Sequence, residues 1–339
     1  MAPHFSPPMW EQRRICIVQT LQQYRAQCVL EVGCGEGNVL APLTFADDSD
    51  FPVTQLYGID CDAGVLEVAR ERLRPMDTDR RDLRVDPLTV DLYCGDGCVP
   101  VAGITPDAVV CSEVLEHVPE ARVGDLTRAV LAGYGPRVAV FTTPNAEFNV
   151  NFPDLQYGTQ HARFRDADHK FEWTRAEFRS WAEQAACTYG YRLAEVRGIG
   201  MAMRDVPAGG FAPSGGCTQM AVFERSSGPA ATGSGAVVGA GPRLFASLEF
   251  PVYDCPRLTP AALRALVLGF ARAVADGDGA FEPQQLWAVL EVRQQFKRRR
   301  ALDSWLAQQL AAAVVGTRGP GTFTLGQSGE QSGRRRGKP

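Results

Sequence analysis

The sequence predicts an α/β protein with a Rossmann-like fold, in which helices cover a mostly parallel central sheet. Short apolar, β-branched runs recur along the chain, and each is followed by a loop rich in glycine, acidic or other polar residues. Segments with helical spacing separate these runs. Parallel strands that are buried on both faces have such continuous apolar runs, and their binding loops gather at the carboxyl edge of the sheet.

The predicted elements follow one another in a regular order. Seven runs have the composition of strands: residues 28–32, 55–60, a run that precedes the loop 94–97, 108–111, 138–141, 191–196 and 217–223. A helix is predicted at residues 63–73. Another is predicted to begin after Thr174, because Thr174 and Glu177 have the spacing of a capping box.

Composition divides the 339 residues into five parts: residues 1–26 as an N-terminal arm, 27–225 as the α/β domain, 226–242 as a flexible linker, 243–316 as a helical extension and 317–339 as a disordered tail. The linker and the tail are rich in Gly and Ser, which favours flexible chain. Within the extension, helices are predicted at 259–275 and 283–315. Nothing in the extension indicates its role.

Composition also limits the class of function. A hydrophobic content of 45% is enough for a real core, and a net charge of −4 means that contact with RNA or DNA must come from a local patch. The ten cysteines include no C-x-x-C pair, which favours reduced thiols over a disulfide framework or a zinc site. No apolar run approaches the about 20 residues that a membrane span needs, and no targeting peptide is recognised.

A glycine-rich loop predicts a cofactor site. The segment Glu31-Val32-Gly33-Cys34-Gly35-Glu36-Gly37 follows the first predicted strand, and Asp60 ends the second. Such a loop lets the backbone approach a ligand, and the acid can bind a ribose diol. The third glycine comes one residue too early for a dinucleotide fingerprint and fits the G-x-G-x-G of S-adenosylmethionine (SAM) binders. We therefore expect a SAM site with these candidate residues: Glu31, Gly33, Cys34, Gly35, Asp60, Asp96 and Ser112.

A second motif, Ser112-Glu113-Val114-Leu115-Glu116-His117, follows the strand at 108–111. If a helical turn begins there, Glu113, Glu116 and His117 stand at i, i+3 and i+4 and share one face. Two carboxylates with one or two imidazoles suit Mg²⁺, Mn²⁺ or Co²⁺. The alternative is an ordinary helix start with two solvated acids and one surface histidine.

Several segments together resemble one family. They are Phe5-Ser6-Pro7-Pro8 with Gln12-Arg13, the loop at 32–35, the motif at 112–117, Thr143-Pro144-Asn145-Ala146-Glu147-Phe148-Asn149, Asp168-His169-Lys170-Phe171-Glu172-Trp173-Thr174-Arg175, and Cys217-Thr218-Gln219. The chain resembles the small-RNA 3′-terminal 2′-O-methyltransferases, the Hua-enhancer family, and in particular the animal branch that methylates piRNAs. The resemblance spans roughly residues 5 to 225. By this resemblance we expect no upstream counterpart of the additional double-stranded-RNA-binding domains of the plant enzymes.

The resemblance implies roles for particular residues. The metal ligands would be Glu113, Glu116, His117 and His169, and the catalytic residues His117, His169 and Glu116. The RNA-binding residues would be Phe5, Pro7, Pro8, Arg13, Asn145 and Phe148. The implied partners are the 3′ end of a small single-stranded RNA and an Argonaute-type protein of the Piwi branch. We expect a cytoplasmic monomer, in RNA granules, with no membrane contact.

The expected reaction is transfer of the SAM methyl group to the 2′-oxygen of the terminal ribose. A cation chelated by the 2′- and 3′-hydroxyls would lower the 2′ pKa and orient that oxygen. One of the two histidines could accept the proton, and the sequence does not indicate which. Two other interpretations are open: a metal-dependent methyltransferase for a small diol such as a catechol, and a non-catalytic RNA-binding or scaffold protein.

Overall fold

The computed structural model describes residues 3–45, 51–81, 84–200, 214–226, 241–253, 256–311, 315–319 and 321–325. The chain divides into two compact units. The first comprises residues 1–47, 51–82 and 87–251, and the second comprises residues 252–339 with the short segments 48–50 and 83–86. Within the described parts of the chain, no helix is both long enough and apolar enough to cross a membrane.

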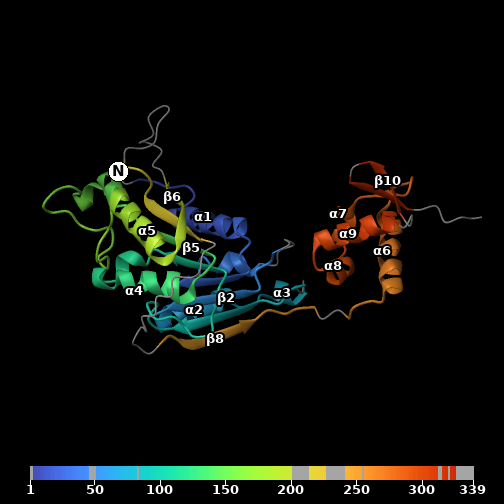
Figure 1. Cartoon of the computed structure of the whole chain (residues 1–339), viewed down its shortest axis with the longest axis horizontal. Coiled ribbons are helices and arrows are strands. Elements are labelled where there is room, and N and C mark those ends of the chain that lie inside the picture. Colours follow the sequence, from blue (N-terminus) through green and yellow to red (C-terminus); the bar gives the residue numbers. More distant parts are fainter. Residues whose placement is uncertain are drawn as a thin grey trace, which may run out of the picture. The chain divides into compact units, whose positions relative to one another are not determined.

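An eight-stranded sheet forms the centre of the first unit (Figure 1). Its strands are β1 (Cys28–Val32), β2 (Gln55–Asp60), β3 (Thr89–Cys94), β4 (Ala108–Ser112), β5 (Val138–Pro144), β6 (Tyr191–Ile199), β7 (Thr218–Arg225) and β8 (Arg243–Glu249). Their order is β6-β7-β5-β4-β1-β2-β3-β8. The five strands from β3 to β5 are parallel, and β6, β7 and β8 are antiparallel to their neighbours. The predicted Rossmann-like fold is confirmed.

Helices cover the two faces of this sheet because successive residues of each strand point to opposite sides. On β1, Val29 packs into a core with α1 (Met9–Gln23) and α2 (Ala63–Leu73). The next residue, Leu30, packs into a second core with α4 (Val123–Arg128) and α5 (Arg175–Tyr189). Both cores are fully buried, which explains the continuous apolar runs in the sequence.

The two predicted helices of this unit are confirmed, and the structure shows how each begins. Asp62 caps α2 by accepting hydrogen bonds from the amides of Gly64 and Val65. Thr174 and Glu177 form the predicted capping box of α5. Such caps satisfy amide groups that have no partner within the helix.

Short helical turns occupy the connections. They are η1 (Ala41–Thr44), α3 (Asp77–Arg81), η2 (Leu115–His117), η3 (Glu120–Arg122), the π-helical η4 (Ala129–Tyr134), η5 (Ala146–Asn151) and η6 (Pro153–Leu155). Two of them, η2 and η5, directly follow the carboxyl ends of β4 and β5. They bring the motif at 112–117 beside the one at 143–149.

Two predicted boundaries of this unit are wrong. The arm at 1–26 contains the helix α1, whose residues Ile17 and Leu21 are buried in the core. The domain does not stop at residue 225, because β8 adds an antiparallel strand to the edge of β3. A change in composition cannot reveal a partner strand about 150 residues away. Most of the predicted linker, residues 227–240, lies outside the described residues.

The second unit has its own core. Its elements are α6 (Pro260–Val274), β9 (Ala280–Phe281), α7 (Pro283–Trp287), α8 (Leu290–Phe296), α9 (Arg299–Ala311), β10 (Val315–Gly319) and β11 (Thr322–Leu325). The first predicted helix is confirmed, whereas the second is divided into three. One break falls at Lys297, whose φ of +58° lies outside the helical region. The strands β10 and β11 pair with each other, and β11 also pairs with β9, so the predicted disordered tail begins too early. Residues 326–339 lie outside the described residues.

Candidate active site

The strand β4 ends in an abrupt turn that separates the acids of the predicted metal motif. Glu113 has a left-handed φ of +55°, and only Leu115–His117 form a helical turn. Glu113, Glu116 and His117 therefore do not share one helical face, and that prediction is wrong. The backbone amide of Glu113 donates hydrogen bonds to two atoms of Thr142, its backbone oxygen at 3.0 Å and its Oγ1 at 3.1 Å. These bonds attach the turn to the neighbouring strand β5.

Three of the four predicted metal ligands meet at this turn. The ligand atoms of Glu116, His117 and His169 lie within 4.8 Å of one another. Glu116 is fully buried, and its Oε2 accepts a hydrogen bond of 2.9 Å from Oγ1 of Thr143. Its other oxygen, Oε1, is buried and has no hydrogen-bond partner among the described residues. Burial, followed by the charge of Glu113, raises the pKa of Glu116 well above its usual range.

Each histidine is held by a carboxylate. Nδ1 of His169 lies 2.6 Å from Oε1 of Glu172, and Nδ1 of His117 lies 3.0 Å from Oδ2 of Asp168. The two imidazole rings meet edge to face with centroids 4.9 Å apart. A carboxylate on one ring nitrogen orients the ring and leaves the other nitrogen for a ligand. Both rings therefore keep Nε2 for a ligand.

This donor set fits a divalent cation. One carboxylate oxygen without a partner and two oriented imidazoles are ligands that Mn²⁺, Co²⁺ and Mg²⁺ accept, with nitrogen favouring the first two. A bound cation would also satisfy the orphaned oxygen of Glu116, whose burial otherwise costs free energy. The structure thus offers a site whose chemistry matches the predicted metal.

Glu113 lies outside this group. Its Oε2 is 3.2 Å from Nη1 of Arg13 in α1 and accepts a 3.4 Å hydrogen bond from Oγ1 of Thr218. Its Oε1 accepts a 2.9 Å hydrogen bond from Thr142. Because both oxygens have partners, Glu113 joins α1, β5 and β7 together at the edge of the site.

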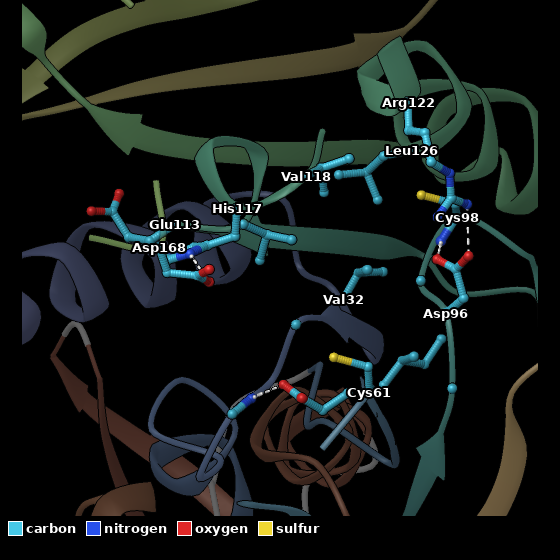
Figure 2. A pocket seen from close by; sticks show the side chains of 17 residues that line it. Val32, Cys61, Asp96, Cys98, Glu113, His117, Val118, Arg122, Leu126 and Asp168 are labelled. Carbon is cyan, nitrogen blue, oxygen red and sulfur yellow. Dashed lines mark hydrogen bonds and ion pairs between the residues drawn. The ribbon is translucent and has the colours of Figure 1, made fainter. Parts of the chain in front are cut away.

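A pocket of about 640 Å³ is lined by one of the three ligands, His117. Figure 2 shows Glu113, His117 and Asp168 at one end of it and Asp96 at the other. Four of the predicted cofactor residues, Gly33, Gly35, Asp60 and Asp96, line the pocket. The predicted cofactor and metal sites therefore share one opening at the carboxyl edge of the sheet.

The glycine loop is held close to η2. Gly33 has a φ of +71°, and a Cβ atom there would lie 2.3 Å from Cγ2 of Val114. Its neighbour Gly35 donates its amide proton to Oδ2 of Asp60 over 2.9 Å. The acid at the end of β2 thus holds the loop and also lines the pocket.

Asp96 has a basic partner that the sequence did not indicate. Nη2 of Arg122 lies 2.6 Å from Oδ2 of Asp96, and Figure 2 shows the two side chains facing each other. Burial alone would raise the pKa of Asp96, but hydrogen bonds from Arg122 and Cys98 outweigh burial and lower it. The carboxylate is therefore kept ionised at the pocket wall.

The other three predicted cofactor residues do not line the pocket. Glu31 is buried in β1, where burial and the nearby Asp60 raise its pKa well above the usual range. Cys34 belongs to the hydrophobic core. The hydroxyl of Ser112 shares a 3.1 Å hydrogen bond with that of Thr142. Pocket residues that were not predicted include Cys61, Cys98 and Arg122, for which the sequence had no motif, and Asp168, which lies inside a quoted motif.

The predicted RNA-binding residues differ in how far they are exposed to solvent. Pro7 and Pro8 are exposed, and Phe5 is half-buried against Phe148, with ring centroids 6.0 Å apart. Phe148 and Asn145, however, are buried. The side-chain amide of Asn145 donates to the backbone oxygens of Ser214 and Gly216, at 2.7 and 2.9 Å. Both side chains therefore have structural contacts within the protein, and RNA binding by Asn145 and Phe148 stays a prediction. Arg13, as described, pairs with Glu113.

The fold, the glycine loop and the adjoining ligand group define a Rossmann-like SAM-dependent methyltransferase domain. Residues 30–131 match the family model of a methyltransferase domain. The small RNA 2′-O-methyltransferase of Xenopus tropicalis is 34% identical over 66% of this chain and 56% of its own length. The Schizosaccharomyces pombe protein of the same name is 34% identical over 67% of this chain and 64% of its own length.

Solved structures agree with these matches. The methyltransferase domain of bacterial CtHen1-C is 31% identical, with a TM-score of 0.50 over 65% of this chain and 100% of that one. The small RNA methyltransferase HEN1 has a TM-score of 0.57 at 25% identity, over 75% of this chain and 28% of that one. The chain belongs to the small RNA 2′-O-methyltransferase family. It spans about half the length of the vertebrate relatives that it matches.

Proposed function

We propose that this protein transfers the methyl group of SAM to the 2′-oxygen of the 3′-terminal ribose of a small RNA. The observation that carries the proposal is the group formed by Glu116, His117 and His169, which adjoins the pocket of the glycine loop. A methyl donor in that pocket and an acceptor hydroxyl at the ligand group would then be neighbours. The names of the relatives support a small RNA as the substrate.

Glu116, His117 and His169 would hold a divalent cation. When bound, such a cation supplies Lewis acidity and a template for two neighbouring hydroxyls. The protein's contribution is to orient the ligands: Thr143 positions Glu116, and two carboxylates position the imidazoles. Because Asp168 is exposed whereas Glu172 is buried, His117 is the more solvent-accessible of the two histidines.

The test is an end-point assay of the full chain with labelled SAM, Mn²⁺ and a short RNA, followed by periodate oxidation. We expect labelled RNA that resists periodate, because a 2′-O-methyl group removes the terminal diol. Glu116→Ala should abolish transfer while leaving the affinity for SAM, measured by calorimetry, nearly unchanged. Calorimetric titration with Mn²⁺ alone gives a readout of the metal site that does not depend on activity.

Three results would redirect the proposal. Activity near wild type in Glu116→Ala would remove the metal assignment. Transfer to catechol but not to RNA would favour the small-diol interpretation, and absence of SAM binding would favour a non-catalytic protein. The piRNA substrate, the Piwi-type partner, the monomeric state and the cytoplasmic location stay predictions from the family resemblance.

A further inference from the structure

A second cavity, of about 520 Å³, lies at the same edge of the sheet. Its lining includes Arg175 and Arg179 of α5, Arg197 of β6, and Asn145, Gly216 and Thr218. Among the described residues that line it, three are arginines and none is acidic. This composition differs from that of the cofactor pocket, which contains several carboxylates.

Each arginine has an acidic neighbour outside the lining. Nε of Arg175 contacts Oε2 of Glu147, Nη1 of Arg179 is 3.7 Å from Oε1 of Glu183, and Nε of Arg197 is 3.3 Å from Oε1 of Glu195. These contacts involve only one nitrogen of Arg179 and one of Arg197, whereas a guanidinium carries five N–H donors. The ion pair of Arg197 lacks hydrogen-bond geometry, so its buried Nε has no hydrogen-bond partner among the described residues. The cavity therefore presents donors that an anion could use.

Guanidinium groups bind phosphates well because their N–H fork matches two phosphate oxygens. Close packing fixes the wall of the cavity. Gly216 packs so tightly that a Cβ atom there would lie 2.5 Å from the amide nitrogen of Ile199. The side chain of Asn145 is bound to backbone oxygens on the same wall. The cavity is thus a formed one with a basic lining.

The cavity is one layer of residues away from the candidate metal site. Asn145 comes two residues after Thr143, which hydrogen-bonds to Glu116. Thr218, also in the lining, hydrogen-bonds to Glu113. Two residues of extended chain span roughly 7 Å. A nucleotide held at the metal site would thus have its preceding linkages within reach of the arginines.

We propose that this arginine cavity binds a backbone phosphate of the RNA, one or two linkages before the terminal ribose. The inference rests on the proposed function and extends it from the terminal ribose to the chain that precedes it. Phosphate contacts position a nucleic acid without reading its sequence. The cavity would therefore raise affinity for RNA of any sequence over that for a single nucleoside.

The experiment uses the full chain and the variants Arg179→Gln, Arg197→Gln and the double variant. Arg175 is left intact because it pairs with Glu147. Arg192→Gln is the matched control: Arg192 lies at the other end of β6, is 61% exposed and pairs with Glu224. RNA affinity is measured by fluorescence anisotropy over a range of salt concentrations, and methyl transfer is measured separately. Thermal melting checks that every variant folds.

We expect the double variant to bind RNA about tenfold more weakly, with SAM affinity and kcat close to wild type. The slope of log affinity against log salt should fall by about 0.7 for each phosphate that the variant no longer binds. RNAs with one neutral methylphosphonate linkage identify the phosphate. At the linkage that the cavity binds, this change should weaken binding by the wild type and not by the double variant.

Wild-type RNA affinity in the double variant would overturn the proposal. So would methylphosphonates that weaken the wild type and the double variant equally at every linkage. Failure of the proposed function has a different outcome: the arginines contribute to RNA binding, but the wild type transfers no methyl group to RNA. That result would leave the phosphate site standing.

Discussion

Nδ1 of His169 lies 2.6 Å from Oε1 of Glu172, a carboxylate whose side chain is only 1% exposed. The same Oε1 accepts the amide proton of Arg165 at 2.7 Å, and Oε2 accepts a 2.5 Å hydrogen bond from Asn149. Glu172 is thus fixed on both oxygens and in turn fixes the ring of His169. Among the described residues, the side chain that holds the ring of His117 in this way is the exposed Asp168.

This difference predicts unequal effects of two matched substitutions. Glu172→Gln should weaken Mn²⁺ binding by about 10-fold to 100-fold, the range for losing a carboxylate behind a ligating histidine. Asp168→Asn should have a smaller effect because Asp168 is 67% exposed. Calorimetric titration with Mn²⁺ measures both, and thermal melting checks that both variants fold. Equal effects of the two substitutions would contradict the unequal support of the histidines.

Asp60 is expected to contribute to SAM affinity in two ways. Asp60→Ala removes the acceptor of the Gly35 amide as well as a carboxylate that lines the pocket. SAM binding should weaken by about 1 to 3 kcal/mol, while Mn²⁺ binding persists. Asp62→Ala is the matched control: it removes the cap of α2 and should lower stability by about 1 kcal/mol without changing SAM affinity. Unchanged SAM affinity in Asp60→Ala would place the cofactor elsewhere.

The raised pKa of Glu31 predicts how the stability of the protein depends on pH. Its folded-state pKa is raised by burial and by Asp60, so the folded protein binds the Glu31 proton more tightly than the unfolded chain does. The resulting stabilisation is fully present below the unfolded pKa of about 4.3 and is lost as the pH rises through the folded pKa. Glu31→Gln should therefore flatten the decrease in melting temperature between acidic and neutral pH. If the melting temperatures of wild type and variant change with pH by the same amount, the raised pKa of Glu31 is contradicted.

The RNA terminus provides the last prediction, which rests on the proposed function. RNA that ends in a 2′-deoxy, a 3′-deoxy or a 3′-phosphate nucleotide should be a poor substrate. The first lacks the acceptor, and the other two lack a diol that a cation held by Glu116, His117 and His169 could chelate. Transfer rates of the three RNAs are compared with those of an unmodified RNA of the same sequence. Efficient methylation of the 3′-phosphorylated RNA would rule out chelation of both hydroxyls.

Local sequence determined most of the sheet and the chemistry of its carboxyl edge. The strands β1 and β2 and the helix α2 have the predicted bounds, because apolar runs and helical spacing act within one element. The capping box at Thr174 needs only residues three apart. Glu116 and His117 could be selected because their motif directly follows the end of a predicted strand, where parallel strands gather their loops, whereas His169 was selected through the family resemblance.

Contacts between distant segments decided the rest. Glu113 leaves the ligand group because its left-handed turn points it toward Arg13, 100 residues earlier in the chain, and Thr218, 105 residues later. Asn145 and Phe148 are buried because distant segments cover them. Asn145 bonds to the segment at 214–217, and Phe148 packs against Phe5 of the arm. Residues 243–249 form the strand β8 because they pair with the backbone of β3, which would otherwise be the edge of the sheet. In each case the partner is set by the tertiary fold, and a pattern of neighbouring residues carries no information about which distant segment will lie opposite.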